Sequence, residues 1–204
     1  MAERRALTRT SRLLRDWLPT LAIIALVFVA RSTLADHSHV PSGSMEPALV
    51  PGDHVVVNKM GYGLRIPFTK RVVALEAPPD RGDVVIFDSP DSGERLIKRV
   101  VAVGGDRVAV HRGRVFINDE PVFRHDRPDA EIYGELTVPL NLEHGGGPGL
   151  PPTRIPEGHA LVLGDHRGNS RDGRFFGLIP YDEIYGRAAG VFWRSGKGPL
   201  WQPL

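Results

Sequence analysis

The chain has 204 residues, enough for one hydrophobic core with a small appendage and too few for two full catalytic domains. Lys and Arg number 26 against 24 Asp and Glu, and the small net charge of +2 excludes a DNA-coating role, so no nucleic-acid partner is expected. The absence of cysteine excludes disulfides, cysteine-ligated zinc and a thiol nucleophile, while 23 Gly and 18 Pro favour many turns and a β-rich fold.

The beginning of the chain has the pattern of a membrane segment. Five arginines precede an apolar run at residues 18–30. A helix over this run alone would span roughly 20 Å of the ~30 Å hydrocarbon core, so we expect a longer transmembrane helix at residues 13–35. The positive-inside rule then makes residues 1–12 a cytoplasmic tail and places residues 36–204 outside the cytoplasm. A cleaved signal peptide ending at Ala35 is the alternative.

Beyond residue 35, short runs of β-branched residues recur between turn signals and predict a domain made mainly of strands. We expect strands at residues 54–58, 83–87, 95–103, 107–111, 114–117, 158–164 and 190–193, and a short helix at residues 181–185. Asn118-Asp119 is expected to form a turn. Residues 125–156 are poorer in such runs and predict a loop or small flap inserted into the main sheet.

Several short motifs are discounted. Arg81-Gly82-Asp83 directly precedes an expected strand and is interpreted as a turn. Residues 190–197 approach a phosphate-binding loop, but Gly198 stands where a magnesium-binding Ser or Thr is required. The eight histidines form no HExxH motif or spaced ligand set, so no metal site is predicted.

The segment PSGSMEPAL places Ser42 and Ser44 around a glycine and between two prolines. Such a segment is rigid and rich in hydroxyl groups, although an ordinary turn would have the same composition. A serine nucleophile needs a neighbouring base, supplied by His in some enzymes and by a neutral amine in others. No sequence signal favours any of the histidines.

Lys98 is the candidate for that base. A strand over RLIKRVVAV places Lys98 between Leu96 and Val100 on one face, in an apolar row. Burial lowers the pKa of a lysine and turns its amine into a general base, a role that arginine cannot take. A strand lysine whose amine reaches out to solvent remains the alternative interpretation.

Four motifs follow one another in the chain: PSGSMEP, RGDVVIF, LIKRVVAVGGD and GDHRGNSRDGRFFGLIP. In this order, and with KMGYGLRIP as a further segment, residues 40–188 resemble the bacterial type I signal peptidases. The resemblance implies that Ser44 is the nucleophile and Lys98 the general base. It also implies that Ser42 completes an oxyanion hole with the Ser44 backbone amide, and that Ser170 orients the lysine amine by a hydrogen bond.

The same resemblance implies the architecture and the remaining site residues. The fold would be mainly β, a multi-sheet catalytic core with a small variable β insert at about residues 107–156, working without metal or cofactor. Structural ion pairs would join Arg99 to Asp165 and Arg174 to Asp172. The candidate walls for small substrate side chains are Val40, Met45, Leu49, Leu96 and Ile97, any of which could instead be core.

The implied activity is the removal of N-terminal signal peptides from exported preproteins that carry small residues at the first and third positions before the cut. The implied location is the bacterial inner membrane, with membrane lipid and the export translocon as further partners.

Two alternatives are a Ser-Lys self-cleaving repressor-type protease and a membrane-anchored β-rich binding or assembly protein on a degenerate peptidase scaffold. The second arises because the last motif departs from the family pattern GDNRDNS at His166 and Gly168, and because Gly173 stands where a Ser is common in the family. We expect these to be loop positions, with Gly168→Asp tolerated.

Overall fold

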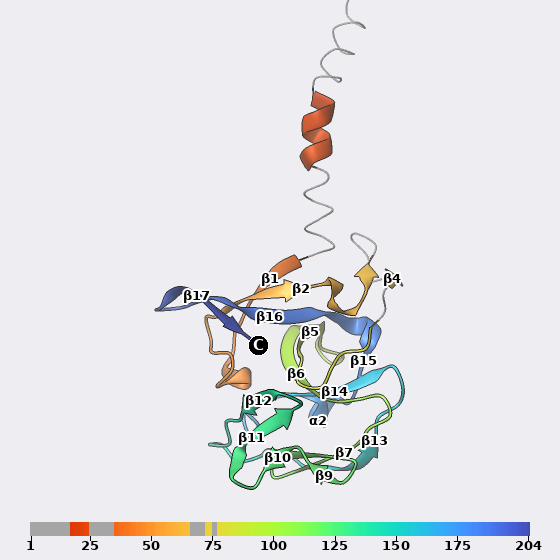
Figure 1. The fold of residues 1–204 in the computed structure, drawn as a ribbon, viewed down its shortest axis with the longest axis vertical. Helices are drawn as coiled ribbons and strands as arrows, with labels where there is room; N and C mark the ends of the chain where they lie inside the picture. The colour runs from red at the N-terminus through yellow and green to blue at the C-terminus, as the bar shows by residue number, and fades with distance from the viewer. Residues whose placement is uncertain (1–16, 25–34, 66–71, 75–76) are drawn as a thin grey trace, which may run out of the picture.

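The computed structural model describes residues 17–24, 35–65, 72–74 and 77–204. Within them the chain forms four antiparallel sheets and only short helical segments, which confirms the prediction of a mainly β, multi-sheet fold. Figure 1 shows the strands gathered into one domain, with β1 at the end nearest the N-terminal helix and the strands of the expected insert at the opposite end.

The main sheet, with eight strands, is the largest of the four sheets. Its strands follow the order β1-β2-β16-β5-β6-β14-β15, and β17 pairs with β16. Their bounds are β1 (Ala35–His39), β2 (His54–Asn58), β5 (Val84–Asp88), β6 (Arg95–Val103), β14 (His159–Leu163), β15 (Ile179–Pro180), β16 (Ile184–Arg194) and β17 (Gly198–Pro203). In β2, Val55 and Val57 alternate with more exposed residues, whereas β5 and the second half of β6 are buried on both faces. The centre of the sheet is therefore covered on both sides.

The chain between β6 and β14 forms two smaller sheets, coloured green to teal in Figure 1. One has the order β13-β7-β8-β9 and the other the order β10-β11-β12. Their strands are β7 (Arg107–His111), β8 (Arg114–Ile117), β9 (Glu120–Pro121), β10 (Phe123–Arg124), β11 (Arg127–Tyr133), β12 (Leu136–Pro139) and β13 (Leu150–Arg154). A last small sheet joins β3 (Leu64–Arg65) to β4 (Val72–Ala74).

Several local predictions are confirmed. The expected bounds at residues 54–58, 95–103, 107–111 and 114–117 match those of β2, β6, β7 and β8. Asn118 and Asp119 both have positive φ, 52° and 69°, which fits the tight turn that joins β8 to β9. The bounds of these strands were predicted correctly because the pattern of apolar residues in each segment agrees with the burial of that segment in its sheet.

Two local predictions are wrong. Residues 125–156 contain β11, β12 and β13 rather than a loop, and these strands agree with the small β insert at about residues 107–156 that the family resemblance implies. β13 tolerates its prolines because it lies at the edge of its sheet. The expected helix at 181–185 is only a 3-10 turn, η3 (Tyr181–Glu183), after which the chain enters β16. The remaining short helical segments are η1 (Gly43–Met45), η2 (Met60–Tyr62) and α2 (Gly173–Phe176).

The expected membrane anchor at residues 13–35 lies largely outside the described residues. Residues 17–24 are helical, with Trp17, Leu18 and Ile23 exposed. In the part of the chain that the structure describes, no helix has both the length and the apolar character required to cross a membrane.

Candidate active site

The structure brings Ser44 and Lys98 into direct contact. Ser44 belongs to η1, in the connection between β1 and β2, and Lys98 lies in the middle of β6, opposite Val85 of β5. A hydrogen bond of 2.6 Å joins Lys98 Nζ to Ser44 Oγ across 54 positions of sequence. This distance is within the reach that a general base needs to take a proton from a hydroxyl group.

Lys98 is buried, with 3% of its surface exposed. Burial lowers the pKa of its amine to about 8 from 10.5, and the charges of Asp172 and Asp165 oppose this shift only in part. No salt bridge to Lys98 is formed by any residue that the structure describes, because both of those carboxylates bind arginines. A substantial fraction of the amine is therefore neutral near pH 8.

Ser42 stands at the N-cap of η1 in an extended conformation, but its side chain makes no capping hydrogen bond. Its hydroxyl instead donates to Ser44 Oγ at 3.3 Å. A serine at this position usually satisfies a backbone N–H of its own helix. The Ser42 hydroxyl thus lies beside the Ser44 oxygen and is not used to cap the turn.

The expected hydrogen bond between Ser170 and the Lys98 amine is not formed. Ser170 Oγ is buried and has no hydrogen-bond partner among the described residues. It packs against Gly164, where an added Cβ would lie 2.3 Å from Ser170 Oγ and 2.5 Å from the Ser44 carbonyl oxygen. Only glycine at position 164, the first residue of the last motif, allows the two serine-bearing segments to approach this closely.

Two arginine–carboxylate pairs surround the dyad that Ser44 and Lys98 form. Arg99 binds both oxygens of Asp165, at 2.9 and 2.7 Å, and also donates to the Gly82 carbonyl oxygen. Arg174 binds Asp172 at 2.8 Å through both Nε and Nη2.

Both carboxylates are fully buried, and Asp172 also accepts from the Gly164 N–H at 3.0 Å. The paired charges therefore fix the backbone that follows β14, which packs against the Ser44 turn.

A shallow cavity of about 30 Å³ lies beside Ser44 and Lys98. Four of the five expected wall residues line it: Val40, Met45, Leu96 and Ile97. Leu49 does not line it, so the prediction that Leu49 forms part of the substrate walls is wrong. Its side chain is fully buried in the core cluster that also contains Val40, Met45 and Ile97. Arg95 also lines the cavity and was not anticipated.

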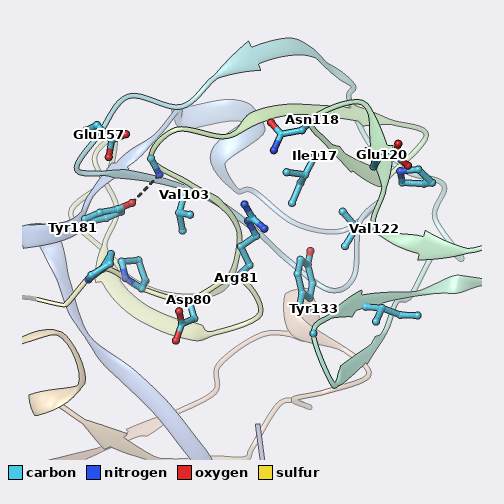
Figure 2. A pocket seen from close by; sticks show the side chains of 16 residues that line it. Asp80, Arg81, Val103, Ile117, Asn118, Glu120, Val122, Tyr133, Glu157 and Tyr181 are labelled. Carbon is cyan, nitrogen blue, oxygen red and sulfur yellow. Dashed lines mark hydrogen bonds between the residues drawn. The ribbon is translucent and has the colours of Figure 1, made fainter.

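A much larger cavity, of about 770 Å³, lies elsewhere, between the end of β6, β8, β9, β11 and the Pro78–Arg81 segment. Figure 2 shows Arg81, Tyr133 and Tyr181 around it, with the Tyr181 hydroxyl bonded to the backbone N–H of Gly104 at 2.8 Å. Neither Ser44 nor Lys98 borders this space. Cavity size is therefore no guide to the position of the dyad.

The contacts between the insert and the last motif were not predicted. Arg167 and Glu131 form a fully buried ion pair, with 2.6 Å between Nη2 and Oε2. His166 contacts His144, also from the insert, at 2.9 Å between ring nitrogens. No sequence signal identifies such partners, because each contact joins segments whose patterns are independent of each other.

The expectation that Gly168→Asp is tolerated is wrong. An added Cβ at residue 168 would lie 2.3 Å from the His144 carbonyl oxygen and 2.7 Å from that of Gly145. These are backbone atoms and cannot rotate away, so glycine is needed here for close approach. As for metals, no group of three His, Asp or Glu side chains among the described residues is arranged to hold an ion.

Comparison with known proteins places the chain in a family. The family model "Signal peptidase, peptidase S26" matches residues 14–193. The signal peptidase I of Pseudomonas fluorescens is 34% identical over 202 residues, which cover 87% of this chain and 71% of that protein. A probable signal peptidase I-2 of Synechocystis is 31% identical, over 83% of this chain and 68% of its own.

A crystal structure of a signal peptidase I from Enterococcus faecalis aligns with 53% of this chain and 95% of its own, at 25% identity and a TM-score of 0.38, too low to bear on the fold. The family model spans most of the chain, and the relatives match it over more than four fifths of its length. The chain belongs to the signal peptidase family, peptidase S26, and is a serine peptidase.

Proposed function

We propose that this protein removes signal peptides from exported preproteins, with Ser44 as the nucleophile and Lys98 as the general base. What supports the proposal most directly is the 2.6 Å contact between Lys98 Nζ and Ser44 Oγ, made by a buried amine without a salt bridge among the described residues. Such an amine is neutral at a pH where an exposed lysine is not.

The reaction follows from this geometry. When the amine is protonated it donates to Ser44 Oγ; when it is neutral the hydrogen bond reverses and the amine accepts the hydroxyl proton. Ser44 Oγ then attacks the carbonyl carbon of the scissile bond, and the protonated amine returns its proton to the leaving amino group. Water hydrolyses the resulting ester, with the neutral amine again acting as the base.

The oxyanion formed during attack needs hydrogen-bond donors in place beforehand. We assign this role to the Ser42 hydroxyl and the Ser44 backbone N–H. The Ser42 hydroxyl lies 3.3 Å from the attacking oxygen and makes no helix-capping bond, so it is available to turn towards the substrate oxygen.

The small cavity beside the dyad supports the proposed substrate class. A volume of about 30 Å³, lined by Val40, Met45, Leu96 and Ile97, is large enough for a methyl group and excludes larger side chains. This supports a preference for small residues at the first and third positions before the cut. Secreted preproteins are thus the proposed substrates, consistent with the names of the relatives.

For the location, we propose a bacterial inner-membrane protein with a cytoplasmic tail at residues 1–12, one anchor at 13–35 and the catalytic domain at 36–204 outside the cytoplasm. Two exposed tryptophans, Trp193 and Trp201, support contact with membrane lipid, because Trp favours the membrane–water interface. They belong to β16 and β17, which Figure 1 shows at the same end of the domain as β1. The export translocon is a further proposed partner.

The test is cleavage of synthetic signal peptides by the purified full chain in detergent. A peptide with Ala at the first and third positions before the bond should be cut, and the same peptide with Leu at both should not. Ser44→Ala and Lys98→Arg should abolish cleavage, whereas Ser92→Ala and Lys197→Arg, at exposed positions, should retain it. Substantial cleavage by Lys98→Arg would overturn the assignment of the base.

Labelling separates this function from that of a binding protein on a degenerate scaffold. A serine-reactive acylating probe should modify Ser44 of the wild-type chain, detected by mass spectrometry of the peptide that contains it. Complete resistance to the probe, together with absence of cleavage, would favour the binding or assembly protein.

A further inference from the structure

A row of three side chains leads from the insert to the turn that carries Ser44. His144 Nδ1 lies 2.9 Å from His166 Nε2, and His166 Nδ1 lies 3.7 Å from Glu46 Oε2. His144 follows β12, His166 follows β14, and Glu46 stands two residues after Ser44. His166 is buried, with 3% of its surface exposed, and its Nδ1 makes no hydrogen bond with any described residue.

The surroundings of His166 determine which ring nitrogen carries its proton. If Nδ1 had no proton, its buried lone pair would face the Glu46 carboxylate, whose side chain is 34% exposed, at 3.7 Å, which is repulsive. A proton on Nδ1 removes this repulsion and leaves Nε2 as the acceptor of the His144 Nδ1–H. The N–H groups of both rings then point along the row towards Glu46.

Glu46 in turn folds back over the turn itself. A Cβ added to Gly43 would lie 3.1 Å from its carboxyl carbon, so the carboxylate covers the residue that separates Ser42 from Ser44. The Glu46 N–H also donates to the Gly43 carbonyl oxygen at 3.1 Å. A force that shifts the Glu46 carboxylate would therefore also shift the turn that carries Ser44.

The backbone of His166 contacts the same turn at a second point. Its N–H donates to the Ser44 carbonyl oxygen at 3.2 Å, while Asn141 of the insert pairs with His166 as an isolated bridge. The side chain and the main chain of one residue thus contact the turn at two points, and Asn141 of the insert pairs with that residue.

We propose that His166, oriented by His144, is a positioning residue that holds the Ser44 turn in its reactive geometry through Glu46. The inference rests on the proposed role of Ser44 as nucleophile. It makes the insert part of the catalytic apparatus, because His144 and Asn141 belong to it. It also gives a function to the histidine that stands where the family pattern has asparagine.

The test compares kcat and KM for cleavage of the Ala-containing signal peptide by the full chain in detergent. His166→Phe keeps an aromatic ring and the backbone hydrogen bond to the Ser44 carbonyl oxygen but removes both ring nitrogens. It should lower kcat by about 10- to 100-fold with KM changed less than about twofold. Glu46→Ala should have the same effect. Glu46→Gln, whose amide oxygen can still face the Nδ1–H and attract it, should keep kcat within about threefold of the wild type. The control is His111→Phe, at an exposed strand position of the insert, which should leave both constants unchanged.

The double variant His166→Phe/Glu46→Ala decides whether the two residues act through one link. A kcat equal to that of either single variant supports the proposal, whereas multiplied losses overturn it. If His166→Phe fails to fold, Glu46→Ala against Glu46→Gln tests the same link at a more exposed side chain; equal kcat for these two overturns it. Cleavage by Ser44→Ala would instead refute the proposed role of Ser44 as the nucleophile, so the two failures are distinguishable.

Discussion

Glu131 of β11 and Arg167, four residues after the last residue of β14, form an ion pair in which neither side chain has any exposed surface. Arg167 also donates to the carbonyl oxygens of Gly113 and Gly164. Glu131 accepts from the Tyr133 hydroxyl at 2.7 Å and from the Val115 N–H at 3.3 Å. One charge from the insert and one from the last motif are therefore each satisfied by several partners, and neither can be removed alone without leaving the other unpaired.

Glu131→Gln should destabilise the protein by about 3–5 kcal/mol, because the Arg167 charge is left buried without its counterion. Urea unfolding of the full chain in detergent measures this loss. The matched control is Asp126→Asn, which breaks the exposed pair with Arg124 and should change the free energy of unfolding by less than about 1 kcal/mol. Equal effects of the two variants would show that the buried pair does not support the fold.

Ser170→Ala removes a buried hydroxyl group that has no partner among the described residues. An unsatisfied buried hydroxyl is costly, so the variant should be as stable as the wild type or more stable. Ser170 packs beside the Ser44 backbone, and we propose that its hydroxyl bonds the Lys98 amine once Ser44 Oγ is engaged with substrate. Turnover should therefore fall by roughly 10- to 1000-fold. Wild-type turnover in Ser170→Ala would contradict this role.

The lowered pKa of Lys98 makes stability depend on pH. The pKa in the folded protein is about 8 and the ordinary pKa of a lysine is 10.5, so between these values the unfolded chain holds a proton that the folded chain has lost. The free energy of unfolding should therefore rise with pH across this window, by about 3 kcal/mol in total. Lys98→Met should lack this rise and be the more stable protein below about pH 8. Lys197→Met, at an exposed position, should retain it, and a rise that persists in Lys98→Met would refute the burial of Lys98 as its cause.

The proposed topology makes a prediction of its own. Protease added outside spheroplasts should digest the domain after Ala35, or release it, and spare residues 1–12. A C-terminal tag that stays protected until the membrane is disrupted would contradict this orientation. If a signal peptide were instead removed after Ala35, N-terminal sequencing of the mature protein would begin at Asp36.

The strands that surround the dyad were predictable because the pattern of apolar residues within each strand indicates which of its side chains are buried. The alternation of Val55 and Val57 in β2 and the apolar row around Lys98 in β6 each need only a single segment to be recognised. The serine–lysine chemistry follows from residue type, since a serine needs a base and the strand offers a lysine that burial would neutralise.

The rest of the site depends on contacts between segments and was not predictable from either one alone. Leu49 is apolar like Met45 and Ile97 and is buried in the same core cluster, and only the fold determines which of these side chains border the small cavity. Gly168 appeared replaceable because its neighbour, the His144 backbone, comes from a part of the chain that was expected to be a flap. The strands β11 to β13 were missed for a related reason, because they contain proline and polar residues and are stabilised by the sheets that they join rather than by their own pattern.

The measurement that tests the central claim most directly is the pH dependence of kcat/KM for signal-peptide cleavage between about pH 5 and pH 10. If neutral Lys98 is the base, kcat/KM should rise with pH to a plateau with a midpoint near the pKa of about 8, and fall about tenfold for each pH unit below it. A profile that stays flat down to about pH 5 would contradict a titrating lysine as the base that activates Ser44.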